Sequence, residues 1–463
     1  MTGRANIMKR LTSLRPGRRA AFIATAAFAG CAALLAPFMA SGNAGSSHKG
    51  GIVCTKSPTA TFDLTAKDGR VQLPDANTAY MWGYSTGFDH STGDVRPGDE
   101  GAFQHPGPVL CVTEGDTVTI VLHNKLKYDD TSIVFPGQTN VTADGAPVQP
   151  QLSGSTVTSL AQTAGKDGGT VTYTFTAGRA GTFLYESGTN PQVQVKMGLF
   201  GALIVRPAGH PNWVYDRADS QFNPGSEYMV LLSEIDPYLN QRMEQIKTKR
   251  SAGQTPPAPF NLASYHPRYW LINGRGFPDS IADNFAQWLP SQPYGALAEI
   301  QPRDAGNPDP SVDRYLSVGS EDYPFHPHGN NAKVIGRDGY PLQTSDLVHA
   351  DLSFDKFSIP AGPGQTWDAL FDWTNQEQYN PDTNPVPTTD PQLQNLVVGT
   401  FYGGTPYLGT RGPLPPGSST QNECGEYYII AHNHALYQIT SWGVNMTGPI
   451  TYTRVNPPNG TCS

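Results

Sequence analysis

The sequence contains only one long apolar run, few cysteines and no long cluster of basic residues. Five of its 463 residues are cysteine, and its formal net charge is −8. An acidic chain without a long Lys/Arg run argues against nucleic acid as a partner. Outside residues 20–40 no apolar run is long enough to cross a membrane, which predicts a soluble body.

The residues that the chain has in abundance indicate short strands and turns. It contains 49 glycines and 41 prolines, both high for a helical protein. Its length and its 38% hydrophobic content are enough for two or three globular domains. The composition therefore favours a β-rich globular protein.

The N-terminal segment, residues 1–44, has the pattern of a signal peptide. Its basic residues end at Arg19, and an uncharged, mostly apolar run and a small polar stretch follow. Arg18-Arg19 also loosely resembles a twin-arginine signal. An uncleaved run could instead serve as an N-terminal anchor, because it is long enough to span a bilayer. The pattern predicts a secreted or extracytoplasmic protein, with membrane anchoring as the alternative.

Removing that segment leaves four cysteines. An even number in an exported chain favours disulfides, and four cysteines allow three pairings. Pairing within each half, Cys54 with Cys111 and Cys424 with Cys462, is the simplest arrangement. None of the four lies beside a histidine, so a copper-thiolate role is not expected.

Residues 52–207 show strands without a helical period between them. Turn residues separate short apolar or β-branched segments, at 109–113, 117–122, 170–176, 181–185 and 199–205. This spacing predicts a β-sandwich or Greek-key barrel.

A second β-rich half, residues 227–460, follows a Pro/Gly/Asn/Asp-rich linker at 208–226. Residues 236–250 are polar and could form a short helix, and we expect an insertion near 237–265. The expected strands lie at 229–232, 269–272, 314–318, 332–335, 357–359, 369–373, 426–431 and 450–454.

Four of the eleven histidines fall into two His-x-His pairs, His326 with His328 and His432 with His434. In an extended segment successive side chains point to opposite faces, so both members of a pair project from the same side. Two such pairs in a β-rich chain predict a metal site built from sheet, and the alternative is surface histidines on strands. The remaining histidines are scattered, and we expect them in solvated loops.

Segments 106–124, 181–207, 326–338 and 432–450 resemble landmark segments of the multicopper oxidases in order and spacing. The resemblance covers nearly all of the chain after the N-terminal segment. It implies an all-β protein of two cupredoxin-like Greek-key domains, similar to the two-domain, laccase-like members. In such relatives the copper cluster often lies between the subunits of a trimer, so a homotrimer is implied as a partner arrangement.

The family builds a trinuclear copper centre from four His-x-His pairs and an electron-accepting type 1 site from His, Cys and His, commonly with an axial Met. Imidazole suits copper, and a thiolate tunes the mononuclear centre for electron transfer. In this chain the first pair of the family falls on Val134 and Pro136, and the second falls on Glu186 and Gly188. Neither pair of histidines is present.

The third and fourth pairs remain as the two His-x-His pairs above, but the type 1 positions between and around them have changed. Tyr323 stands at the first type 1 histidine, Asn433 at the cysteine and Gln438 at the second histidine. Met446 matches the axial methionine only after a small insertion. An amide does not replace a thiolate as a copper ligand, so laccase-type catalysis by the standard route is not expected.

Several functions stay open for an exported protein with these residues. The first is a mononuclear site, with copper or zinc held by His326, His328, His432 and His434. The second is a metal-free binding or structural protein, whose histidines bond to Glu186 or to each other. The third uses Glu186 as a catalytic general base beside a metal-bound water. Ordinary copper-dependent oxidoreductase activity is the last, and a small molecule or metal ion is the expected ligand.

Overall fold

The computed structural model describes residues 50–304, 306–344, 352–374, 386–387, 421–422 and 427–456. The predicted targeting segment lies outside this range, and so do Cys424 and Cys462. Strands dominate the described residues, which confirms the all-β prediction. None of the helices among these residues has the length and apolar character needed to cross a membrane.

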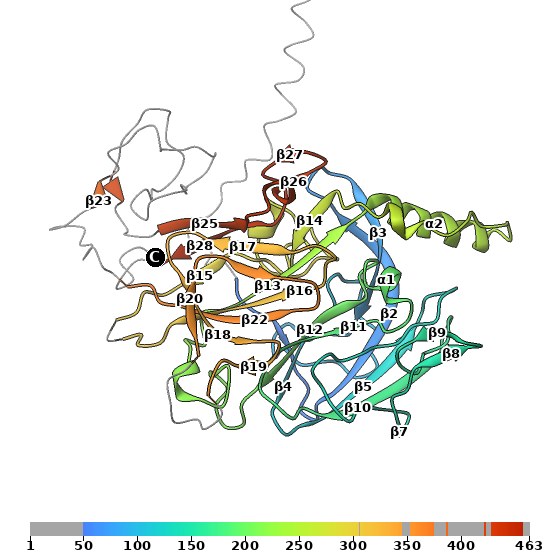
Figure 1. The fold of residues 1–463 in the computed structure, drawn as a ribbon, viewed down its shortest axis with the longest axis horizontal. Coiled ribbons are helices and arrows are strands. Elements are labelled where there is room, and N and C mark those ends of the chain that lie inside the picture. Colours follow the sequence, from blue (N-terminus) through green and yellow to red (C-terminus); the bar gives the residue numbers. More distant parts are fainter. Residues whose placement is uncertain are drawn as a thin grey trace, which may run out of the picture. The chain divides into compact units, whose positions relative to one another are not determined.

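Two sheets form the first half of the chain (Figure 1). The four-stranded sheet has the spatial order β1 (Cys54–Thr55), β4 (Val109–Thr113), β12 (Phe200–Arg206), β11 (Gly181–Glu186). The six-stranded sheet has the order β3 (Thr78–Ser85), β2 (Thr61–Gln72), β5 (Thr117–Asn124), β10 (Thr170–Thr176), β6 (Thr142–Ala143), β7 (Ala146–Pro147). Every second residue of β5 is buried, and Val118, Ile120 and Leu122 join a core with residues of the other sheet.

Two further sheets form the second half. The larger contains, in spatial order, β14 (Tyr269–Ile272), β13 (Glu227–Ile235), β16 (Ser311–Ser317), β22 (Thr366–Phe371), β18 (Ala332–Arg337) and β19 (Tyr340–Pro341), with β20 (Phe354–Lys356) paired to β18. The smaller has the order β15 (Ala298–Ile300), β28 (Ile450–Val455), β25 (Tyr427–Asn433), β17 (Tyr323–Pro327), β21 (Ile359–Ala361). The two sheets share one apolar core.

Short hairpins and helices complete the described residues. The hairpins are β8 (Gln151–Ser153) with β9 (Thr156–Ser159) and β26 (Thr440–Ser441) with β27 (Val444–Asn445), and β23 (Val386–Pro387) pairs with β24 (Gln421–Asn422) in a separate two-stranded sheet. The helices are α1 (Pro191–Gln194), α2 (Pro237–Ser251), η1 (Ala218–Ser220), η2 (Leu262–Ser264), η3 (Asp279–Ile281) and η4 (Leu436–Ile439). The side chain of Asp236 accepts a hydrogen bond from the Tyr238 N–H at 2.9 Å and so caps α2. The helix predicted at 236–250 is confirmed.

Buried apolar clusters and an ionic network join the strands of the two halves, although none of the described sheets combines strands from both. One cluster brings Leu184 and Ile204 together with Leu231 and Leu316. The buried Arg314 side chain donates to Thr182 Oγ1 of the first half at 2.9 Å and also binds two carboxylates of its own half. Its Nε lies 2.7 Å from Glu227 Oε1, and its Nη1 lies 3.3 Å from Asp368 Oδ1. Because packing between the two halves is continuous, the positions of the domain boundaries remain a prediction.

The segment predicted as a linker, 208–226, packs closely against the second half. Val214, Tyr215 and Phe222 are buried in a cluster with Val312 and other residues of that half. The Tyr215 hydroxyl donates to Asp368 at 2.6 Å. The prolines and glycines of residues 208–226 thus lie in turns of a packed segment rather than in a flexible linker.

Cys54 and Cys111 form a disulfide, as predicted. The bond joins β1 to β4, which are neighbouring strands, so the N-terminal end of the described chain is held to its sheet. The other predicted pair lies outside the described residues.

Candidate metal centre

Strand pairing brings the two His-x-His pairs together. β17 and β25 are antiparallel neighbours, and their register places His326 directly opposite His432 (Figure 1). Directly opposite residues project from the same face of a sheet, with Cβ atoms about 4.5 to 5.5 Å apart. His328 and His434 follow the ends of these two strands, each two residues further along the chain.

The four imidazoles form a compact cluster. Their ring centroids are 4.5 Å apart for His326–His328, 5.5 Å for His432–His434, 5.1 Å for His328–His432, 5.3 Å for His326–His434 and 5.8 Å for His326–His432. His434 is exposed, and the other three rings are half-buried. The cluster therefore has one open side.

Backbone carbonyls orient two of the rings. His326 Nδ1 bonds to the carbonyl oxygen of Phe357, and His432 Nδ1 lies 2.8 Å from the carbonyl oxygen of Asn433. A carbonyl can only accept, so each Nδ1 carries the proton and each Nε2 presents its lone pair. Metal-ligating histidines use the same arrangement, since a bond from the second nitrogen sets the tautomer and the ring plane.

His328 and His432 face each other with their Nε2 atoms 3.0 Å apart. Because the lone pair of His432 is at Nε2, His328 donates its Nε2–H in this bond. Burial, and next the neighbouring imidazoles, lower the pKa of His328 to about 4. Burial also lowers the pKa of His432. Both rings are thus neutral near pH 7, which is the form that binds metal.

The distance between these two nitrogens suits adjacent ligands of one ion. Imidazole nitrogens lie about 2.0 to 2.1 Å from zinc, which separates neighbouring ligands by about 2.9 Å at a right angle and about 3.3 Å in a tetrahedron. Among the described residues, however, no group of three or more His, Cys, Asp or Glu side chains already stands in ligand geometry. A third ligand therefore requires rotation of a ring, and the exposed His434 ring has the room for it.

A buried polar network lies behind the imidazoles. Asn433 is fully buried, and its Nδ2 donates to Gln438 Oε1. Gln438 Nε2 donates in turn to Glu321 Oε2 at 2.7 Å. Tyr323 is also fully buried, and its hydroxyl donates to Glu234. The network has no thiolate and no imidazole.

Comparison with known proteins supports the resemblance. Residues 102–210 match a family model described as Multicopper oxidase. An L-ascorbate oxidase from Cucumis sativus is 30% identical over 187 residues, covering 40% of this chain and 27% of that protein. The copper resistance protein A of Escherichia coli is 29% identical over 180 residues, covering 38% and 25%. The chain thus matches only about a quarter of the length of these relatives.

Solved structures agree at the level of the fold. A blue copper oxidase from Nitrosomonas europaea superposes with a TM-score of 0.52 at 18% identity, covering 86% of this chain and 85% of that one. The multicopper oxidase mgLAC gives a TM-score of 0.51 at 17% identity, with 88% of each chain covered. Residues 102–210 are thus similar in sequence to the multicopper oxidases, and the chain shares their fold.

The polar network explains what has happened at the type 1 positions of this multicopper oxidase relative. The Tyr323 hydroxyl donates to Glu234, while Asn433 donates to Gln438, which donates in turn to Glu321. Met446 is 37% exposed, outside this network. These residues do not fit a type 1 copper.

Two residues of the network were missed by sequence reasoning. Glu234 accepts bonds from the Tyr265 hydroxyl at 3.1 Å and from the Ser320 N–H at 2.7 Å, besides the one from Tyr323. Glu321 accepts from Trp270 Nε1 at 2.9 Å. Both are ordinary carboxylates in the sequence, and only the tertiary contacts distinguish them.

The segments that carry the first two family pairs lie beside each other in the first half. Val134 and Glu186 form a backbone bridge, with N–O distances of 2.8 and 3.1 Å. A Cβ added to Gly188 would lie 2.7 Å from Val134 Cγ1. Burial raises the pKa of Glu186. Among the described residues, none of the interactions of Glu186 reaches the four imidazoles.

One of the scattered histidines differs from the expectation of a solvated loop. His105 is only 1% exposed, and its ring packs edge-on against Phe200 with centroids 5.2 Å apart. The sequence context, Gln104-His105-Pro106, gave no apolar signal for this burial.

Proposed function

We propose that this multicopper-oxidase-like protein holds a single metal ion, with copper as the family's metal, through His326, His328, His432 and His434. The proposal rests on the convergence of four imidazoles, two of which are oriented by backbone carbonyls so that Nε2 carries the lone pair. Copper bound by imidazoles would supply one-electron redox chemistry. The chain itself supplies neutral rings and an open side at His434.

The proposed site differs from that of a standard oxidase of the family. Asn433 occupies the position of the electron-accepting thiolate, and its amide is already bonded to Gln438. Without that ligand set, electrons have no type 1 entry point. We therefore propose metal binding or limited redox activity in place of laccase-type turnover, and zinc is the alternative metal.

A metal-free binding or structural role is the second candidate. The observation that favours it is the direct hydrogen bond between His328 and His432, which satisfies both rings without an ion. The low pKa of His328 lets this bond persist in mildly acidic solution. In this case the polar network around Asn433 stabilises the fold in place of a metal.

A hydrolytic variant of the proposal gives Glu186 the role of general base. Among the described residues its interactions do not reach the imidazoles, so we place this role in an assembly in which a neighbouring copy brings Glu186 to the cluster. A homotrimer of the family's kind would supply one, and light scattering of the purified protein measures it. We include export through the N-terminal segment in the proposal, and N-terminal sequencing of the secreted protein tests it.

Metal analysis of the purified protein tests the main proposal. The wild type is incubated with Cu²⁺ or Zn²⁺, dialysed and measured by mass spectrometry of the elements. We expect one ion per chain in the wild type and none in the double variant His326→Ala/His432→Ala. The double variant His123→Ala/His210→Ala, which removes two histidines outside the cluster, is expected to keep the ion.

The same samples separate the candidates. Metal-free wild type supports the second candidate and overturns the first. Retention of the ion by His326→Ala/His432→Ala places it elsewhere. An intense blue colour would contradict the absence of a type 1 centre.

A further inference from the structure

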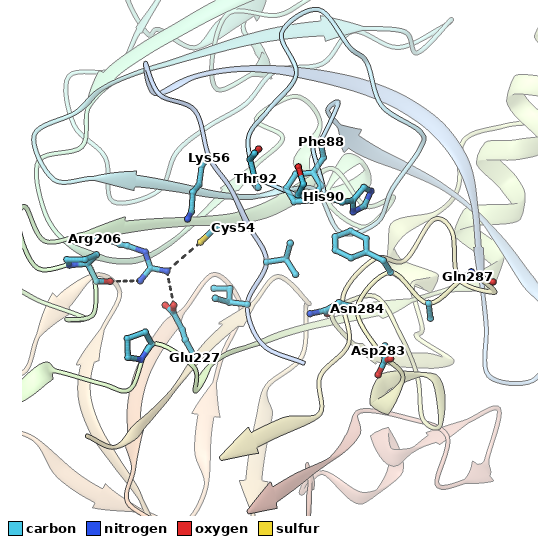
Figure 2. Close-up of a pocket in the computed structure, with 18 of the residues that line it drawn as sticks. Cys54, Lys56, Phe88, His90, Thr92, Arg206, Glu227, Asp283, Asn284 and Gln287 are labelled. Atoms are coloured by element: carbon cyan, nitrogen blue, oxygen red, sulfur yellow. Dashed lines mark hydrogen bonds and ion pairs between the residues drawn. The ribbon is translucent and has the colours of Figure 1, made fainter. Parts of the chain in front are cut away.

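A cleft of about 940 Å³ lies between segments of the two halves, and the four histidines of the candidate centre do not line it. Its walls come from the start of the described chain, the loop at 88–93 and the loop at 283–288 (Figure 2). A second cavity of about 310 Å³ shares the wall formed by Val53, Phe88, His90 and Phe285. Clefts of this size take small organic molecules.

One wall of the cleft is aromatic. The Phe88 and Phe285 rings stack with centroids 5.8 Å apart, and His90 meets both edge-on, at 5.1 and 4.5 Å. The Phe285 ring remains 38% exposed. The three rings therefore offer an uncovered aromatic surface.

The backbone holds Phe285 in a conformation that a bulky residue rarely adopts. Its φ is +58°, in the left-handed region. Its N–H donates to Pro293 O at 2.7 Å, and Asn284 ties the same loop to Gly51 O at 2.9 Å. Such strain persists only where surrounding contacts enforce it, and it concentrates at ligand sites. Here it presents an apolar ring to the cleft.

The facing wall is cationic. Arg206 Nη2 lies 2.7 Å from Glu227 Oε2 and 3.5 Å from Cys54 Sγ. Arg314 also binds the Glu227 carboxylate, so two guanidinium groups neutralise it. Lys56 is two residues beyond Cys54 in extended chain, which directs its side chain to the same side.

Lys56 itself is left available. It is exposed, and in the described part of the chain its amine has no ion-pair or hydrogen-bond partner. Figure 2 shows Lys56, Cys54 and Arg206 on one side of the view and Phe88 and His90 on the other. A molecule in the cleft can therefore meet a free ammonium group and an aromatic surface at the same time.

We propose that this cleft binds a small aromatic carboxylate, with its carboxylate at Lys56 and its ring against Phe285 and Phe88. A charge-assisted hydrogen bond to the ammonium group favours an anion over a neutral molecule. Offset or edge-on ring contacts favour an aromatic body over an aliphatic one. Among the described residues that line the cleft, Lys56 is the one cation without a partner, and a single cation suits a monocarboxylate better than a multiply charged phosphate.

Calorimetric titration of the purified full chain tests the proposal, with benzoate as the probe. Benzamide keeps the ring and shape without the charge, and acetate keeps the charge without the ring. We expect both to bind at least about tenfold more weakly than benzoate, because each loses one class of contact. Absence of benzoate binding, or equal binding of benzamide, would overturn the proposal.

Two variants locate the binding. Lys56→Met is expected to weaken benzoate about tenfold and to leave benzamide unchanged. Phe285→Gly removes the ring while glycine accepts the positive φ without strain, and it is expected to weaken both probes by up to about tenfold. Lys333→Met, which removes another exposed lysine, on β18, is the control and should bind as the wild type does. Unchanged benzoate affinity in Lys56→Met and Phe285→Gly would place the ligand outside this cleft.

Discussion

Replacing His105 by leucine should remove a defined part of the acid sensitivity of the fold. Neither ring nitrogen of His105 has a hydrogen-bond partner by geometry among the described residues, and a contact with the Gly198 backbone only partly opposes the effect of burial on its pKa. Burial lowers the pKa of His105 to about 4, from an ordinary value of about 6.5. Between pH 4 and pH 6.5, therefore, His105 is protonated in the unfolded chain and neutral in the folded chain.

The sign and size of the effect follow from proton linkage. Where the unfolded state binds more protons, stability rises with pH, so the contribution of His105 is present above pH 6.5 and is lost as the pH falls towards 4. A shift of this size corresponds to a loss of about 2 to 3 kcal/mol between pH 7 and pH 4.5. Leucine cannot take up the proton, so between pH 7 and pH 4.5 the stability of His105→Leu should fall by about 2 to 3 kcal/mol less than that of the wild type.

Urea unfolding at pH 7 and at pH 4.5, followed by tryptophan fluorescence, measures the difference. The histidines of the candidate metal centre are present in both proteins, so their protonation cancels in the comparison. At pH 7 His105→Leu should be about as stable as the wild type, because it replaces unpaired polar atoms by an apolar group of similar size. Parallel loss of stability in the two proteins would refute the assignment of a buried, neutral His105.

Three further predictions concern the interface and the metal positions. Arg314→Met should lower the free energy of unfolding in urea by about 3 to 5 kcal/mol, because it leaves the Asp368 carboxylate buried without its cation. Adding Asp368→Asn to that variant should restore part of the loss. Strictly additive effects of the two substitutions would contradict the coupling. Gly339→Ala should lower the free energy of unfolding by about 1 to 3 kcal/mol more than Gly364→Ala. Both glycines have positive φ, but of these two positions only at Gly339 would the new Cβ clash with a buried phenylalanine ring. Equal losses in urea unfolding would argue against that clash. Asn433→Cys alone, loaded with copper, should give no intense blue absorption, because tyrosine and glutamine still occupy the other type 1 positions. A blue band in the visible spectrum would show that other ligands suffice.

Local patterns predicted much of the fold because they depend on near neighbours. Asp236 begins the helix at 237–251 by capping it, which is a contact over two residues. Alternating burial along β5 follows from the period of an extended strand. The Cys54–Cys111 bond was one of three pairings that counting allowed, and the structure selects it.

Burial of polar residues was predicted poorly because it depends on distant partners. Tyr323 lies far along the chain from Glu234, and nothing in the sequence around either residue indicates that the two form a hydrogen bond when buried. His105 gave the same difficulty, since its burial comes from segments such as the one at 198–200. The segment at 208–226 has the composition of a linker but packs through a few scattered apolar side chains.

The amino-acid sequence alone determined the chemistry available to this protein. It supplies four imidazoles in two pairs, and it places an amide where the family has a thiolate. Tertiary structure alone decided that His328 and His432, which are 104 residues apart, lie within hydrogen-bond distance. The physical reason is that side-chain type and alternation are local properties, whereas the register between β17 and β25 is set by the packing of the whole sheet.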